Sequence, residues 1–217
     1  MAYNFGTING PYAASLFTYD PHADGPVFMV NFMRYKEVAV YDDGRETTLS
    51  GQEADDLYAP LDVLGRIGAD VAFHGEVEGL GEREWHRIGI VRYPTRKSFM
   101  DMQSRPDFLE RFVHKEAGME FTIVMTTLAT SPLPDELLEA EHLTFVGLPE
   151  GAAFESSQPF GVLAVEDVVI GDERRFDRLV VVGGSLELFS LPEGAVVATA
   201  VRELDAMVTL VAETIGG

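Results

Sequence analysis

Residues 27–35 read VFMVNFMRY, and this stretch decides the fold class because it is apolar at odd and even positions alike. The side chains of a strand alternate between two faces, so a run without alternation predicts a strand that is buried on both faces. Pro26 and Lys36 bound the run on either side. We therefore expect a sheet that is covered on both sides.

Helical and strand patterns alternate after this first strand. Proline and glycine punctuate them, and Pro60 is expected to kink or restart the first helix. The predicted elements are, in order, a strand at 27–35, a helix at 51–68, strands at 69–77 and 84–93 joined by a turn at 78–82, helices at 94–102 and 106–115, and a strand at 120–128. The order β-α-β-β-α-β is that of the ferredoxin-like arrangement, an antiparallel sheet with helices on one face.

Strand parity divides the predicted sheet into two faces. One face is uniformly apolar and is expected to lie beneath the helices: Phe28, Val30, Phe32, Val71, Phe73, Ile88, Ile90, Phe121, Ile123 and Met125. The other face is mixed: Met29, Asn31, Met33, Ala72, His74, Glu76, Trp85, Arg87, Gly89, Val91, Tyr93, Thr122, Val124 and Thr126. A mixed face with aromatic residues suits a ligand cavity, and we expect a second sheet to close it.

The element order repeats in weaker form in the second half of the chain. The predicted elements are a strand at 161–170, a helix at 172–182, strands at 185–191 and 195–202, and a helix at 204–214. No fourth strand follows, and the apolar run at 143–148 is the candidate to supply it from the other end of the sheet. After His142 the chain has no His, Trp, Tyr, Asn or Lys, so the second copy is expected to be structural. The sequence thus predicts an α+β fold of tandem ferredoxin-like domains.

The predicted division of the chain is an N-terminal arm at 1–26, a ferredoxin-like domain with the candidate site at 27–130, a linker at 131–160 and a degenerate second ferredoxin-like domain at 161–217. Two assemblies satisfy this division. The second sheet closes over the first as an intramolecular pseudo-dimer, or each copy pairs with its twin in a homodimer.

Composition excludes several function classes. Sixteen Lys and Arg residues against 36 Asp and Glu give a net charge of −20, which repels nucleic acids and anionic membrane surfaces. The absence of Cys excludes disulfides, thiolate metal sites and Cys nucleophiles. The first 25 residues lack the pattern of a secretory signal, and no apolar run is long enough for a membrane span. A cytoplasmic protein is therefore expected.

Four segments of the first half resemble an uncharacterised bacterial family of the dimeric α/β-barrel superfamily. They are VNFMRY (30–35), YAPLDVLGRIGADVAFHGEV (58–77), EWHRIGIVRYPTRKSFMDMQSRPDF (84–108) and HKEAGME (114–120). The resemblance covers about residues 27–128 and implies a ferredoxin-like fold with a barrel of two sheets. The chain departs from the family in having Trp85-His86 where Trp-Asp is usual and His114-Lys115 where His-Arg is usual. The superfamily includes cofactor-independent enzymes, haem enzymes and ligand binders, so the resemblance implies no single activity.

The mixed face supplies the candidates for catalysis. His74 is a candidate proton-transfer base, because a neutral imidazole accepts and returns a proton near pH 7. Glu76 shares its strand face and would raise its basicity. Asn31 is the one strongly polar amide in an apolar strand, so it either binds ligand oxygen or makes a structural hydrogen bond. A buried, hydrogen-bonded His74 without a catalytic role is the alternative.

Other residues of the first half are candidates for substrate binding. Arg87 on the mixed face needs a carboxylate partner, for which Glu76 is suited, or it awaits an anionic ligand. Trp85 and Tyr93 bracket the same strand and would pack against a ring or simply fill the core. His114 would approach the cavity mouth or interact with its helix C-terminus, and the hydroxyl of Tyr58 is a further candidate.

No pattern in the sequence indicates a metal or a bound cofactor. The five His residues lack metal-binding spacing, and neither a dinucleotide-binding nor a phosphate-binding glycine motif occurs. We therefore expect a small-molecule-binding protein that uses no cofactor, in one hypothesis an enzyme of the proton-transfer, isomerase, cyclase or monooxygenase type acting on a carbonyl or aromatic compound. The alternatives are a non-catalytic ligand binder and a structural dimerisation module.

Overall fold

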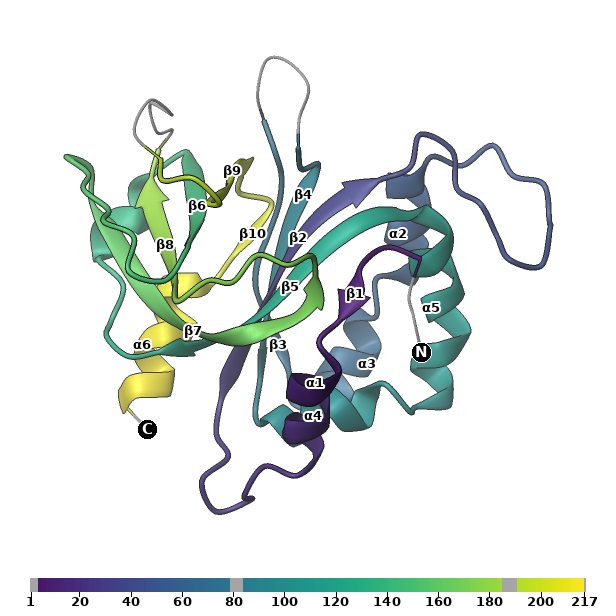
Figure 1. Ribbon diagram of the computed structural model, residues 1–217, viewed down its shortest axis with the longest axis horizontal. Coiled ribbons are helices and arrows are strands. Elements are labelled where there is room, and N and C mark those ends of the chain that lie inside the picture. Colours follow the sequence, from purple (N-terminus) through teal and green to yellow (C-terminus); the bar gives the residue numbers. More distant parts are fainter. Residues whose placement is uncertain (1–3, 79–83, 185–190, 217) are drawn as a thin grey trace.

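The protein is described by a computed structural model over residues 4–78, 84–184 and 191–216. Within these residues the chain forms one curled antiparallel sheet, with helices packed against part of its outer face (Figure 1). Most of the turn predicted at 78–82 and of the strand predicted at 185–191 lies outside the described residues. The mixed composition of helices and antiparallel strands is confirmed.

The first half follows the predicted order. Its elements are β2 (Val27–Tyr35), α2 (Gly51–Tyr58), α3 (Leu61–Arg66), β3 (Asp70–Glu76), β4 (Arg87–Tyr93), α4 (Arg96–Met102), α5 (Pro106–Gly118) and β5 (Met119–Ala129). Ser50 and Thr95 begin α2 and α4 with capping boxes, which satisfy amide groups that a helix start leaves open. Of the two effects expected of Pro60, the structure has the restart, because α2 ends at Tyr58 and α3 begins at Leu61. Within the described residues, no helix has the length and apolar character that a membrane crossing would require.

The second half repeats the strand order of the first. Its elements are η1 (Asp135–Glu139), β6 (His142–Leu148), β7 (Phe160–Gly171), β8 (Arg178–Gly183), β9 (Val196–Val201), β10 (Leu204–Asp205) and α6 (Met207–Gly216). Within the described residues, no helix lies between its strands β6 and β9. The first half has the order β3-β4-β2-β5 and the second β7-β8-β6-β9, so in each the first strand lies between the third and the fourth. The helix predicted at 172–182 is wrong, because the apolar run at 179–182 forms β8. The last helix begins at Met207, three residues later than predicted.

The sheet closes on itself to form a barrel. At one junction β5 pairs with β7 over several residues. At the other, β3 meets the end of the chain: Val77 forms a bridge with Ala200, and His74 pairs with Leu204 of β10. The amide of Glu78 donates to the carbonyl of Thr199 at 2.9 Å. We call this second junction the seam.

The barrel interior corrects the predicted orientation of the sheet. Phe28, Val30 and Phe32 lie in the interior and share one core cluster with Phe145 and Val181 of the second half. The uniformly apolar face therefore faces the second sheet, and the mixed face lies beneath the helices. Val71 and Ala72 are exceptions, because a register shift in β3 between Val71 and Phe73 places Val71 on the helix side and Ala72 in the interior. The physical reason is that strands seal the barrel interior on all sides, so it takes the face with the fewest polar groups.

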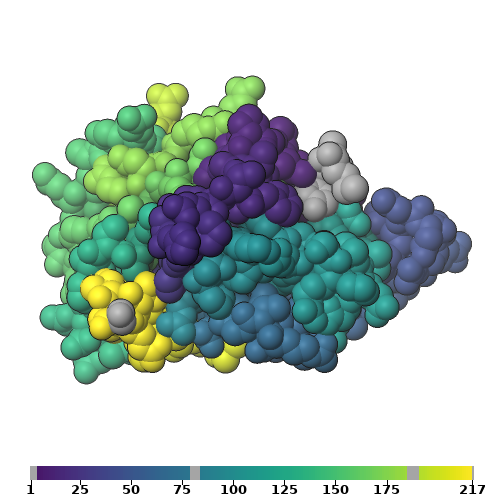
Figure 2. Space-filling model, turned by 90° about the horizontal axis from the view of Figure 1, so that it is seen from below, coloured from purple at the N-terminus to yellow at the C-terminus, as the bar shows by residue number. Residues whose placement is uncertain are grey.

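The N-terminal segment ties the two halves together. β1 (Thr7–Ile8) pairs with β7, and in α1 (Gly10–Phe17) the Tyr12 hydroxyl donates to Glu166 at 2.9 Å. Arg96 of α4 forms ion pairs with Asp24 and with Glu166 of β7. Figure 2 shows this segment in purple, lying between the green second half and the teal helices of the first.

Candidate functional site

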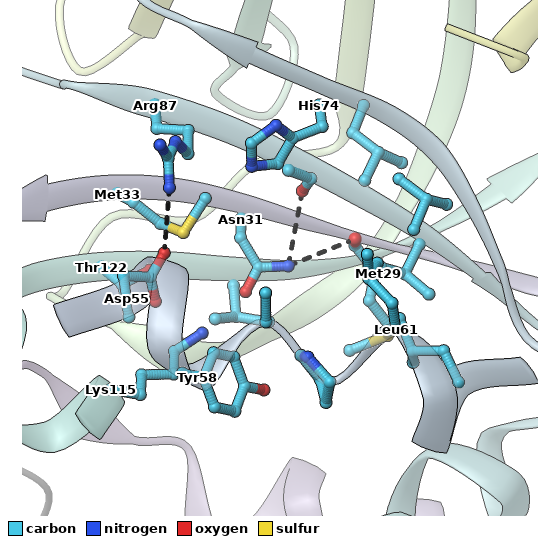
Figure 3. A pocket seen from close by; sticks show the side chains of 18 of the residues that line it. Met29, Asn31, Met33, Asp55, Tyr58, Leu61, His74, Arg87, Lys115 and Thr122 are labelled. Carbon is cyan, nitrogen blue, oxygen red and sulfur yellow. Dashed lines mark hydrogen bonds and ion pairs between the residues drawn. The ribbon is translucent and has the colours of Figure 1, made fainter. Parts of the chain in front are cut away.

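A cavity of about 270 Å³ lies between the mixed face of the first sheet and helices α2, α3, α4 and α5. The sheet supplies Asn31 and Arg87 on one side, and the helices supply Tyr58 and Lys115 on the other (Figure 3). The mixed face thus lines a cavity as expected, but helices cover it in place of a second sheet.

Two glycines bring α2 and α5 close together beside this cavity. A Cβ atom on Gly51 would lie 2.3 Å from the carbonyl oxygen of Gly118, and one on Gly118 would lie 2.2 Å from that of Gly51. Only a residue without a side chain allows this approach. It fixes Asp55 on α2 and Lys115 on α5 at the same end of the cavity.

Lys115 is the most unusual residue of the cavity. Its side chain is 9% exposed, and its Nζ atom lies 4.9 Å from the centroid of the Tyr58 ring. Within the described residues, no hydrogen bond or ion pair of this amine is found. Burial lowers the pKa of Lys115, and the charge of Asp55 opposes this shift only in part. The cavity therefore holds an amine that loses its proton more readily than an exposed lysine.

A buried ionic cluster stands next to Lys115. Arg87 donates to Asp56 at 2.7 Å and lies 3.6 Å from Asp55, while the Tyr35 hydroxyl donates to Asp55 at 2.6 Å. Although burial disfavours its charge, the neighbouring Tyr35, Asp56 and Asp55 raise the pKa of Arg87. Burial, together with the charge of Asp55, also raises the pKa of Tyr35. The guanidinium stays charged, and the cluster ties β4 to α2.

This cluster is incompletely hydrogen-bonded. Within the described residues, Arg87 Nε and Asp55 Oδ1 are buried atoms without a hydrogen-bond partner. The predicted partner Glu76 lies farther away, at 3.8 Å from Arg87, and its side chain is exposed and accepts from Gln52. The carboxylate nearest to Arg87 is therefore that of Asp56. At the polar end of the cavity, one buried donor and one buried acceptor are left without a hydrogen bond within the described residues.

Asn31 presents a weakly held amide to the cavity. Its Nδ2 atom donates to the carbonyl oxygens of Met29 and Gly89, each at 3.4 Å, which is long for such a bond. Its carbonyl oxygen points toward the side of the cavity that holds Lys115 and Tyr58 (Figure 3). The sequence offered two roles for Asn31, a structural hydrogen bond or contact with a ligand. The amide makes hydrogen bonds to neighbouring strand carbonyls and also faces the cavity, so its position suits both roles.

The opposite end of the cavity is apolar and aromatic. Tyr93 is buried, its hydroxyl donates to the sulfur of Met102 at 3.7 Å, and burial raises its pKa. Beside Lys115, Tyr58 packs edge-on against Phe108 and Phe112 of α5, so aromatic rings also border the polar end. A ligand that enters this cavity therefore meets apolar surface over most of its length and polar groups at one end.

His74 lies at the edge of the cavity and is part of the seam. Its Nδ1 atom is 2.7 Å from Glu203, which follows β9, and its side chain is 31% exposed. The carboxylate paired with His74 is therefore Glu203, and not Glu76 as expected. The reason is that barrel closure brings residue 203 to β3, which no local pattern reveals.

Besides Glu76, whose exposed side chain is not part of the cavity lining, two further candidate residues do not reach the cavity. Trp85 is 1% exposed in the barrel interior, stacked on Phe121; it precedes β4, so strand parity does not extend to it. His114 lies on the far side of α5, where its Nδ1 atom is 2.6 Å from the hydroxyl of Tyr41. Both placements correct the expectation that these side chains line the cavity.

The sequence interpretation missed Lys115, although a signal was present. Phe108, Phe112 and Lys115 stand at positions i, i+4 and i+7 of one helix, which places the lysine in an apolar stripe. Within the described residues, no group of His, Asp or Glu is arranged to hold a metal ion. The arrangement offers amine chemistry, hydrogen bonding and apolar packing.

Replacing Lys115 by methionine is expected to raise the free energy of unfolding at pH 7 by about 1–2 kcal/mol, because the folded chain no longer buries an unpaired ammonium group. The pKa of Lys115 is lower in the folded protein than its ordinary 10.5. The unfolded chain therefore binds more protons between these two values, so wild-type stability rises with pH across that window.

Urea unfolding of both proteins at pH 7 and pH 9.5 measures this difference. The advantage of Lys115→Met should shrink at the higher pH. A variant that is clearly less stable than wild type at pH 7 would show that the amine stabilises the fold.

Comparison with known proteins adds fold information only. No family model and no curated protein matches the sequence. Among solved structures, the methylated RPA0582 protein matches with 28% identity and a TM-score of 0.50, over 62% of this chain and 98% of its own. A second structure of RPA0582, described as a protein of unknown function from Rhodopseudomonas palustris, matches with 25% identity and a TM-score of 0.45, over 58% of this chain and 95% of its own.

A mutant chlorite dismutase from Candidatus Nitrospira defluvii is similar to 88% of the chain and 95% of its own length, with 8% identity and a TM-score of 0.43. The first RPA0582 structure spans the larger part of this chain with nearly its whole length. The chain therefore shares its α/β fold over that part with a protein of unknown function and carries a further portion besides.

Proposed function

We propose that this chain binds a small carbonyl compound with an apolar body in the cavity between the first sheet and its helices. The observation that carries the proposal is the amine of Lys115, which is buried, faces the cavity and has no ionic partner within the described residues. The amine has no acceptor from the protein within the described residues, and a ligand oxygen in the cavity would supply one.

The remaining lining supports the same class of ligand. The cavity is close to the lower end of the range for small-molecule sites, which are mostly apolar with a few placed polar groups. In this proposal Lys115 and Asn31 contact the ligand oxygen, Tyr58 and Tyr93 pack against its body, and Arg87 holds the polar end in shape through Asp55 and Asp56. His74 stands at the entrance as the candidate for proton exchange with solvent.

We also propose that the chain is an intramolecular pseudo-dimer of two ferredoxin-like units. The shared strand order of the two halves supports this, and so does the common core that joins their inner faces. In the second unit, Ala152 and Phe154 of the loop before β7 pack over the outer face where the first unit has helices. One binding cavity per chain follows, in the first unit.

Calorimetric titration with acetophenone, benzaldehyde and toluene tests the binding proposal. Acetophenone and benzaldehyde should bind more tightly than toluene, which has a similar ring but no oxygen. Val124→Phe, which adds bulk at the cavity wall, should weaken binding at least about tenfold, the equivalent of about 1.4 kcal/mol.

Val40→Phe is the matched control, because it adds the same side chain on an exposed loop and should leave binding unchanged. Equal affinity for all three compounds, or an equal effect of both variants, would contradict a carbonyl-binding cavity.

A further inference from the structure

We propose that Lys115 is a nucleophile that forms a Schiff base with an aldehyde or ketone held in the cavity. The inference rests on the proposed binding function and goes beyond it, since it assigns a covalent step to one atom, Lys115 Nζ. Three features carry it: the burial of the amine, its position against the cavity, and the chemistry of the chain's other lysines.

The chain contains only three lysines, at positions 36, 97 and 115. Lys36 donates to the carbonyl oxygens of Glu116 and Ala117 at 3.1 and 3.0 Å, and Lys97 pairs with Asp101 at 2.6 Å. Both amines donate to oxygen acceptors. Lys115 alone of the three faces the cavity, so the protein has kept one amine apart from oxygen acceptors.

The surroundings of Lys115 favour the reactive, neutral form of the amine. Only a neutral amine carries the lone pair that attacks a carbonyl carbon, and desolvation in an apolar pocket is a recognised means of activating a lysine. The amine lies 4.9 Å from the centroid of the Tyr58 ring, and Phe108 and Phe112 line the same cavity. The lowered pKa of Lys115 agrees with this environment.

The step balances without a further reactant. The lone pair of Lys115 Nζ forms a bond to the carbonyl carbon, and the C=O π electrons move to oxygen. A proton passes from nitrogen to that oxygen and gives a carbinolamine. The C–O bond then breaks and the oxygen departs as water with both amine protons, leaving a C=N bond. Hydrolysis reverses the sequence, so the adduct is not a dead end.

Reductive trapping tests the proposal. Wild-type protein is incubated with benzaldehyde at pH 7 and reduced with sodium cyanoborohydride, and the benzylated lysines are identified by peptide mass spectrometry. Lys115 should be labelled at least about tenfold faster than Lys97, because Lys97 is exposed and paired with Asp101 whereas Lys115 faces the cavity where benzaldehyde binds. Lys115→Arg and Lys115→Met should lose this fast labelling, while Lys36→Arg and Lys97→Arg keep it.

The outcomes separate this inference from the binding proposal. Fast labelling confined to Lys115 supports it. Calorimetric binding of benzaldehyde without fast labelling of Lys115 overturns the Schiff base and leaves the binding function standing. Absence of both overturns both. Since Lys115→Met is expected to be at least as stable as wild type, its loss of labelling would not reflect unfolding, and circular dichroism of each variant checks this.

Discussion

Gly75→Ala is expected to open the barrel at the seam and to lower the free energy of unfolding by about 3 kcal/mol. A Cβ atom at this position would lie 2.0 Å from the carbonyl oxygen of Val201. That oxygen belongs to the backbone, so no side-chain rotation relieves the clash and the two strands must separate. The seam is short, because the bridge of Val77 with Ala200 is followed by a pairing of β3 with β10 over only two residues of that strand.

Urea unfolding measures the loss, and hydrogen exchange locates it. Faster exchange is expected at the amides of Glu78 and Glu203, which donate across the seam to Thr199 and His74. Gly65→Ala is the matched control, since a Cβ atom there meets nothing within 4 Å and alanine suits a helix better than glycine. Unchanged stability of Gly75→Ala would mean that the seam adjusts freely.

Arg87→Met is expected to cost about 3–5 kcal/mol of stability, because it leaves Asp55 as a buried charge without its cationic partner. Asp55 is 7% exposed, and its Oδ1 atom is a buried acceptor without a hydrogen bond within the described residues. The change also removes the 2.7 Å bond to Asp56, which joins β4 to α2. The helix that carries one wall of the cavity would lose its anchor.

A double variant identifies the cause of this loss. Adding Asp55→Asn to Arg87→Met removes the isolated charge and should restore part of the stability. Arg45→Met is the control on the surface, because Arg45 and Asp43 form an exposed pair and little change is expected. An Arg87→Met protein as stable as the Arg45→Met protein would rule out a buried ionic anchor.

The sequence predicted the first half better than the second for a physical reason. The helices of the first half carry local start signals, such as the capping residues Ser50 and Thr95, and its strands are bounded by proline and glycine. In the second half, the apolar run at 179–182 is too short to distinguish a strand from a helix by periodicity. Its strand character comes from pairing with β6 and β7, which are distant in sequence.

Strand parity identified the two faces of the first sheet but not which way each faces. Met29 and Phe28 are both buried, because one face packs on helices and the other on the second sheet. Alternation is the same for either orientation of the sheet. The number of polar side chains on a face is then the only guide to its orientation. The face with more polar side chains lies against the helices, where the cavity is.

The candidate site was predicted in part for a related reason. Asn31, Arg87 and Tyr93 share one side of the sheet, and they do line one cavity. Lys115 lies on α5, whose rotation about its axis is fixed by packing with α2 and the sheet and not by strand parity. Trp85 lies outside the regular strand, where parity has no meaning. The carboxylate next to His74 comes from 129 residues away.

Because the chain's own second half closes the barrel, the inner face of the first sheet stays uncovered during part of synthesis. The first sheet is complete at Ala129, whereas the last strand that covers its inner face ends at Val201. At typical translation rates these 70 or so residues take about 4–15 s. Throughout that interval Phe28, Val30 and Phe32 have no covering sheet, and the nascent chain presents an apolar surface to its neighbours. Up to Ala129 the chain already carries 20 Asp and Glu against 12 Lys and Arg. This negative charge protects the unfinished protein, because chains that repel one another associate slowly.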